Sequence, residues 1–78
     1  MIKLYTNVVL KTNRFASEGV TSGMVGVTVD RFKGGVYQVE FSKENGDTIA
    51  LIEVSQLDIE PAPRDGWFLP EFVLQPDD

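Results

Sequence analysis

The chain contains neither cysteine nor histidine. Without cysteine it forms no disulfide and no thiolate nucleophile, and without both residue types the usual ligand sets for zinc and transition metals are missing. The missing imidazole also excludes catalytic devices that pair a serine or cysteine with a histidine. Only carboxylate sites for calcium or magnesium are left open. We therefore expect a protein that is not an enzyme, with no catalytic residue, no cofactor, no bound metal and no small-molecule substrate.

Long hydrophobic runs are absent too. No stretch approaches the roughly 18 consecutive apolar residues of a membrane-spanning helix. The first residues include Lys3 but lack the apolar segment that is typical of a secretory signal. We expect a cytoplasmic protein that does not contact a membrane.

The chain is also short. Its 78 residues form one domain at most, and a domain of this size buries only about 60–65% of the surface that its unfolded chain exposes. Ordering the chain costs about 1.5 kcal/mol per residue, so nearly every apolar side chain is needed for folding. Little apolar material is left for an elaborate buried active site.

Basic residues are scarce and unevenly placed. The net charge is −5. Residues 1–43 hold six basic and three acidic side chains, whereas residues 44–78 hold nine acids and a single base, Arg64. Such asymmetry indicates either a surface for a partner or simply an acidic, solvated second half.

What the sequence does contain is typical of an all-β protein. Valine, isoleucine, threonine and aromatic residues dominate, turn residues recur at short intervals, and no long helical period is present. Alternation places Val25, Val27 and Val29 on one face of a strand, and Tyr37, Val39 and Phe41 on one face of the next. The predicted strands are residues 4–10, about 24–32, 36–42, 48–54 and 57–60.

The connections between these strands carry turn signals. Lys33-Gly34-Gly35 predicts a tight connection, because glycine reaches positive φ without steric penalty. Asn45-Gly46 predicts a hairpin with a type I′ turn, in which both central residues need positive φ. Residues 11–23 form a long polar loop, and we expect Pro61 and Pro63 to end the last strand because proline cannot continue a ladder.

Beyond the predicted sheet of residues 1–61, the extension of residues 62–78 is rich in large apolar side chains. Burying two of its aromatic residues alone is worth roughly 8–12 kcal/mol before entropy is subtracted, so the segment must dock somewhere. It either folds back over the outward row of Ile49 and Leu51 or docks on a second copy or another protein. The apolar residues of this tail are Trp67, Phe68, Leu69, Phe72, Val73 and Leu74.

The order of a long loop, two short connections and a single turn before the last strand is similar to that of Src-homology-3-like small barrels. Over residues 4–61 the chain resembles a family of short bacterial proteins catalogued as a domain of unknown function. The resemblance implies a five-stranded small barrel and says little about activity, because fold does not imply function. It is carried by Leu4-Tyr5, Val8-Val9-Leu10, Glu18-Gly19-Val20, residues 23–29, residues 36–41, residues 46–50 and residues 57–61.

Two functions are compatible with these features. We expect a protein-interaction module that self-associates through its C-terminal segment or binds a larger partner protein, as an inhibitor or stabiliser of it. The alternative is a nucleic-acid-associated module resembling KOW barrels, which have a similar arrangement of two glycines and a valine to Gly23, Gly26 and Val27 at the start of the second predicted strand. Nucleic acid is disfavoured by the net charge. Its binding edge would consist of Lys11, Arg14, Phe15, Arg31 and Lys33.

Overall fold

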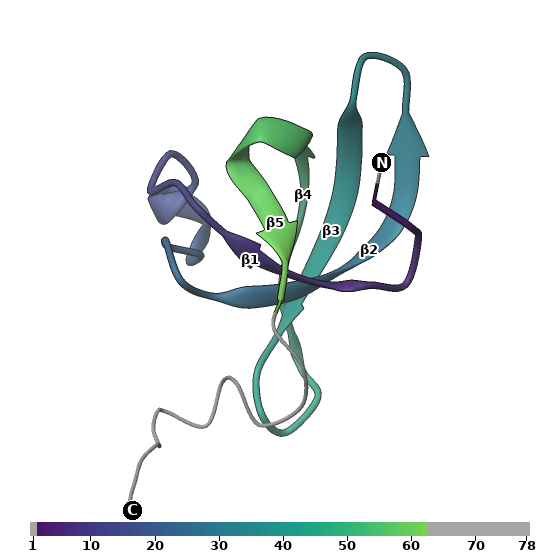
Figure 1. Ribbon diagram of the computed structural model, residues 1–78. Coiled ribbons are helices and arrows are strands. Elements are labelled where there is room, and N and C mark those ends of the chain that lie inside the picture. The colour runs from purple at the N-terminus through teal and green to yellow at the C-terminus, as the bar shows by residue number, and fades with distance from the viewer. Residues whose placement is uncertain (1, 63–78) are drawn as a thin grey trace, which may run out of the picture.

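The computed structural model describes residues 2–62, which form one antiparallel sheet of five strands (Figure 1). The strand order is β4-β3-β2-β1-β5, and the end strands β4 and β5 are not paired with each other. The prediction of an all-β fold is confirmed, whereas the sheet is open and closure into a barrel is not confirmed. The elements are β1 (Asn7–Leu10), η1 (Ala16–Glu18), β2 (Val25–Phe32), β3 (Val36–Ser42), β4 (Thr48–Ser55), η2 (Gln56–Asp58) and β5 (Ile59–Pro61).

The core lies on one face of this strongly curved sheet. Successive side chains of a strand point to opposite faces, and the buried residues of β3 and β4 follow this alternation, as their pattern predicts. On β2, however, the face that points to the core carries Gly26 and Thr28 rather than the valines. The buried hydrophobic side chains of the described residues are Val8, Val9, Leu10, Val20, Tyr37, Val39, Phe41, Ile52, Val54 and Ile59.

The first strand is shorter than predicted, because residues 3–6 form a turn. β1 begins at Asn7 instead of residue 4. Tyr5 adopts a positive φ of 62°, which is incompatible with a continuous strand. The buried Thr28 bridges this turn: its hydroxyl donates to the Lys3 carbonyl at 2.8 Å and accepts from the Thr6 N–H at 3.1 Å. This long-range polar contact decides the local backbone.

Both predicted hairpin connections are present, but one turn differs in type. Gly34 and Gly35 have positive φ, as the tight β2–β3 connection requires. Between β3 and β4, Gly46 has a φ of 94° whereas Asn45 does not have positive φ, so the type I′ prediction is wrong. The Gly46 N–H instead donates to the Lys43 carbonyl, and the register shifts between Phe41 and Ser42. The extra residue of this bulge removes the need for positive φ at both central positions.

The last strand also differs from its prediction. Residues 56–58 form the helical turn η2, which Ser55 caps by accepting the Leu57 N–H at 3.1 Å. β5 then includes Pro61, which pairs with Val8. Proline is tolerated here because alternate residues of a strand bond to the neighbour. The next residue, Ala62, donates its N–H to the Asn7 carbonyl at 2.8 Å, so the missing N–H of Pro61 faces away from β1.

Candidate functional site

The sheet has a second apolar surface on the side opposite the core. Strand register places Leu51 beside Glu40, Glu40 beside Val27, and Val27 beside Asn7, in one row across four strands. In the next row Val9 pairs with Val25. We call these six residues the outer face.

Apolar side chains on the outer face are incompletely covered. Val25 and Val27 are half-buried, and Leu51 is 52% exposed. The alternation in β2 therefore correctly groups the valines, but it does not reveal that the core takes the opposite face. The signal that could have shown this is Gly26: a Cβ there would lie 2.7 Å from Val39 Cγ1 and 2.9 Å from the Glu40 carbonyl oxygen, so only glycine fits where the strands meet.

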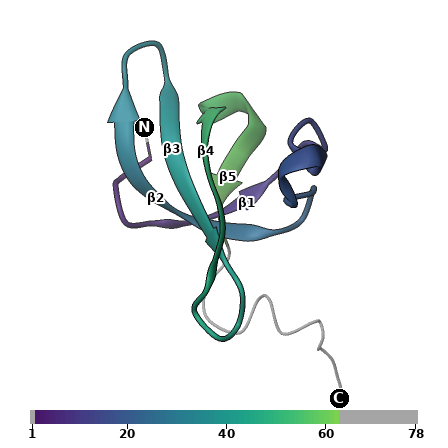
Figure 2. The same ribbon diagram turned by 180° about the vertical axis from the view of Figure 1, so that it is seen from behind.

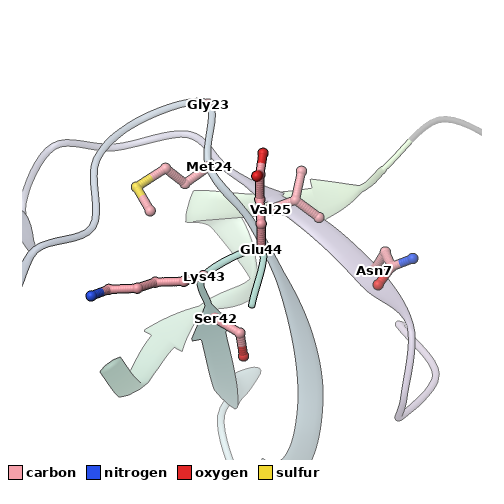
Figure 3. Close-up of a pocket in the computed structure, with 7 residues that line it drawn as sticks. All are labelled: Asn7, Gly23, Met24, Val25, Ser42, Lys43 and Glu44. Atoms are coloured by element: carbon pink, nitrogen blue, oxygen red, sulfur yellow. The ribbon is translucent and has the colours of Figure 1, made fainter. Parts of the chain in front are cut away.

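An open cleft of about 530 Å³ adjoins the outer face (Figure 3). It lies between the start of β2 and the beginning of the β3–β4 connection, and it shares Asn7 and Val25 with the outer face. Figure 3 shows the Met24 and Lys43 side chains extending toward the same side of it. The cleft thus combines apolar groups with one cation, Lys43, and one carboxylate, Glu44. Its lining residues are Asn7, Gly23, Met24, Val25 and residues 42–44.

The described chain ends beside this cleft. The hydrogen bond from Ala62 to the Asn7 carbonyl holds the exit of β5 against a residue that lines the cleft. Residues 63–78 therefore follow in the sequence from a position beside the cleft. The predicted interface residues Trp67, Phe68, Leu69, Phe72, Val73 and Leu74 lie outside the described residues.

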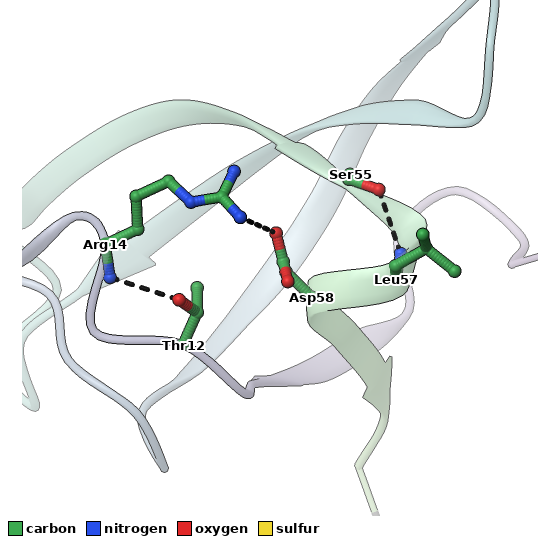
Figure 4. Close-up of polar contacts among 5 residues, drawn as sticks. All are labelled: Thr12, Arg14, Ser55, Leu57 and Asp58. Atoms are coloured by element: carbon green, nitrogen blue, oxygen red, sulfur yellow. Dashed lines mark hydrogen bonds and ion pairs between the residues drawn. The ribbon is translucent and has the colours of Figure 1, made fainter.

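Two of the basic residues predicted for a nucleic-acid edge are paired with acids, and Figure 4 shows the pair of Arg14 with Asp58. Arg14 lies 3.2 Å from the Asp58 carboxylate, and its guanidinium is 6.0 Å from the centre of the Phe15 ring. Lys11 lies 3.9 Å from the Glu60 carboxylate. These contacts join the long loop to η2 and β5, and they offset the positive charge that a phosphate would need.

The other two predicted bases lie elsewhere. Arg31 is near the end of β2 and Lys33 lies in the β2–β3 turn. Figures 1 and 2 both show this turn and the loop of residues 11–23 on opposite sides of η2. η2 contacts each of them, because Gln56 N–H donates to the Gly35 carbonyl and Asp58 meets Arg14. The four bases therefore do not gather in one place.

Residues 2–62 contain no group of three or more acidic side chains arranged to hold a metal ion. Neither helical turn among these residues is long and apolar enough to cross a membrane.

Comparison with known proteins identifies one family. Its sequence model, described as Domain of unknown function (DUF4926), matches residues 4–61. No curated protein and no solved structure matches the chain. The matched range covers all five strands and stops before the C-terminal extension.

Proposed function

The chain belongs to the DUF4926 family, and we propose that this member is a non-catalytic, cytoplasmic protein-interaction module that self-associates or binds a larger partner protein. In this proposal the apolar residues at positions 67–74 are the part that docks on the other chain. The family description assigns no activity, so the proposal rests on the surface of the domain.

The observation that carries the proposal is the second apolar face of the sheet. A small domain needs nearly all its apolar side chains for its core, yet Val25 and Val27 lie opposite the core and Leu51 is more than half exposed. Exposed apolar surface is typical of interaction sites, and here Val25 and Val27 adjoin on one strand whereas Glu40 separates Leu51 from them. The aromatic residues of the tail are of the type that dominates binding energy at protein interfaces.

Nucleic-acid binding remains the alternative proposal, but the geometry supports it less. Lys11 and Arg14 contact carboxylates, and the β2–β3 turn that carries Lys33 lies apart from them. The net charge of −5 adds long-range repulsion for a polyanion.

Self-association is tested on the full chain with Phe72→Asp. We expect the unaltered protein to sediment as a dimer at micromolar concentration. The charged variant should weaken this association by roughly tenfold to a hundredfold, because a buried aromatic side chain is lost from the interface. Analytical ultracentrifugation over a concentration series measures the change.

The matched control is Gln75→Asp, which adds the same charge three residues further along at a polar position. It should leave the dimer unchanged. A full-length protein that stays monomeric at every concentration, and is unaffected by Phe72→Asp, contradicts self-association. Salt-sensitive binding of a single-stranded oligonucleotide that Arg14→Glu and Arg31→Glu abolish would support the alternative.

A further inference from the structure

We infer that the cleft beside Asn7, together with Val25 and Val27 of the outer face, is the acceptor site for residues 67–74 of a second copy of the chain. Two copies would then exchange their C-terminal segments reciprocally about a twofold axis. This inference rests on the proposed function and names the surface that receives the segment.

The size and the apolar groups of the cleft suit an apolar segment. Its volume of about 530 Å³ lies within the range of about 300–1,000 Å³ typical of sites that enclose bulky ligands. Met24 and Val25 provide apolar contact, and the flexible thioether of methionine adapts to aromatic rings. Lys43 and Glu44 place one charge of each sign at the wall of the cleft, so its apolar groups are what favour the segment.

The position of the exit brings the segment to this region. Ala62 is bonded to Asn7, so the chain leaves the sheet at the cleft itself. Trp67 lies five residues further on, a reach of up to about 17 Å for an extended chain. The apolar residues therefore begin within about 17 Å of the point where the chain leaves the sheet.

The direction of the exit favours a second copy over the same copy. β5 runs antiparallel to β1, so at Ala62 the chain is moving past the start of β1 and away from Val9 and Val25. Ala62 precedes Pro63, and a residue before proline is restricted to extended conformations. At the end of the described residues the chain is thus directed away from the part of its own cleft that contains Val25.

The alternative acceptor is the row of Ile49 and Leu51 on β4. Ile49, however, packs against the core and lies beside the long loop, since a Cβ at Gly19 would lie 3.3 Å from Ile49 Cγ2. Of this predicted outward row, Leu51 is the exposed residue. Leu51 is two strands from Val27 in the same row, which is a distance of about 10 Å. The two acceptors are therefore separable by single substitutions.

The test uses Trp67, the sole tryptophan of the chain, whose fluorescence emission reports the surroundings of the segment. We compare Val27→Lys with Leu51→Lys in the full-length protein. Both changes place a lysine beside Glu40 on the outer face, Val27→Lys on one neighbouring strand and Leu51→Lys on the other. An ion pair between the new lysine and Glu40 therefore affects the two variants equally. Circular dichroism verifies that each variant is folded.

On dilution of the unaltered protein, Trp67 emission should shift to longer wavelength as the dimer dissociates. Val27→Lys should raise the concentration at which this occurs by about tenfold or more, since it replaces an apolar contact with a charge, and Leu51→Lys should not. If Val27→Lys fails to fold, Ser42→Arg on the exposed wall of the cleft takes its place and should have the same effect.

Two results overturn the inference and separate it from the proposed function. If the protein dimerises but only Leu51→Lys weakens the dimer, the acceptor is the β4 row, and self-association stands. If Trp67 is shielded from water at every concentration in a monomeric protein, the segment docks within its own chain, and both the inference and the self-association proposal fail.

Discussion

Thr28 shows how much one buried side chain determines in so small a domain. Within residues 2–62 it is the polar side chain that is fully buried. Its hydroxyl stands between the Lys3 carbonyl and the Thr6 N–H, where a β-turn usually closes with a direct hydrogen bond. The backbone of Thr28 adds bonds to Tyr5 and Thr6. The turn at residues 3–6 is therefore held entirely from β2.

Thr28→Val is expected to lower the free energy of unfolding by about 1–3 kcal/mol. Valine has nearly the same shape, so the loss comes from leaving the Lys3 carbonyl and the Thr6 N–H without the hydroxyl. Urea denaturation measures it. Thr28→Ser keeps the hydroxyl and loses only a methyl group, and it should cost less than Thr28→Val. A Thr28→Val protein as stable as the unaltered chain would show that the bridge contributes nothing.

Residues with such distant partners set the limit of sequence analysis. The alternation Tyr37, Val39 and Phe41 correctly predicts a core-facing row because all the information is local. Tyr5 gives no warning of positive φ, since its conformation is imposed by a residue more than twenty positions away. A similar argument holds for Gly26, whose role depends on the strands that approach it.

Among the elements, the β3–β4 hairpin offers a test of turn geometry. Gly46→Ala is expected to cost about 1–2 kcal/mol, because Gly46 has a φ of 94° and an alanine there adopts a left-handed conformation. No atom lies within 4 Å of the added Cβ position, so the cost is backbone strain alone. Thermal or urea unfolding measures the change.

Asn45→Ala provides the control for this hairpin. It removes a side-chain hydrogen bond, from the Asp47 N–H to Asn45 Oδ1 at 2.9 Å, but imposes no backbone strain, because Asn45 does not have positive φ. We expect a cost below that of Gly46→Ala. Equal costs at both positions would indicate the type I′ turn that the sequence suggested.

Element prediction succeeded where turn chemistry and alternation agree. β3 and the two hairpins that flank it were predicted closely, since Gly34-Gly35 and Asn45-Gly46 bracket an alternating run. The end of the sheet was predicted less well. Pro61 was expected to terminate β5, but an end strand tolerates proline where its missing N–H faces away from the neighbour.

For the molecule as a whole, the two oppositely charged parts of the sequence meet in the fold. Lys11 and Arg14 from the basic half contact Glu60 and Asp58 from the acidic half. Sequence analysis assigned these bases to a possible nucleic-acid edge, because charge counting along a chain does not reveal which charges become neighbours. Leu51 was predicted to point outward, but the place of Val25 and Val27 on the same outer face was missed for a related reason: a valine row shows amphipathicity but not which side the core occupies.

The concentration dependence of Tm should also distinguish the sheet domain from its C-terminal extension. A chain that ends at Pro63 is expected to fold, because the ten hydrophobic side chains buried within residues 2–62 lie between Val8 and Ile59 and the Ala62 hydrogen bond is retained. The full chain should show a Tm that rises with protein concentration, since association stabilises the folded state by mass action. The shortened chain should show a Tm independent of concentration. Differential scanning calorimetry over a wide concentration series measures both.

If the Tm of the full chain is also independent of concentration, residues 64–78 do not stabilise the fold through contacts between chains. If the shortened chain is unfolded, residues 64–78 are part of the folded domain itself.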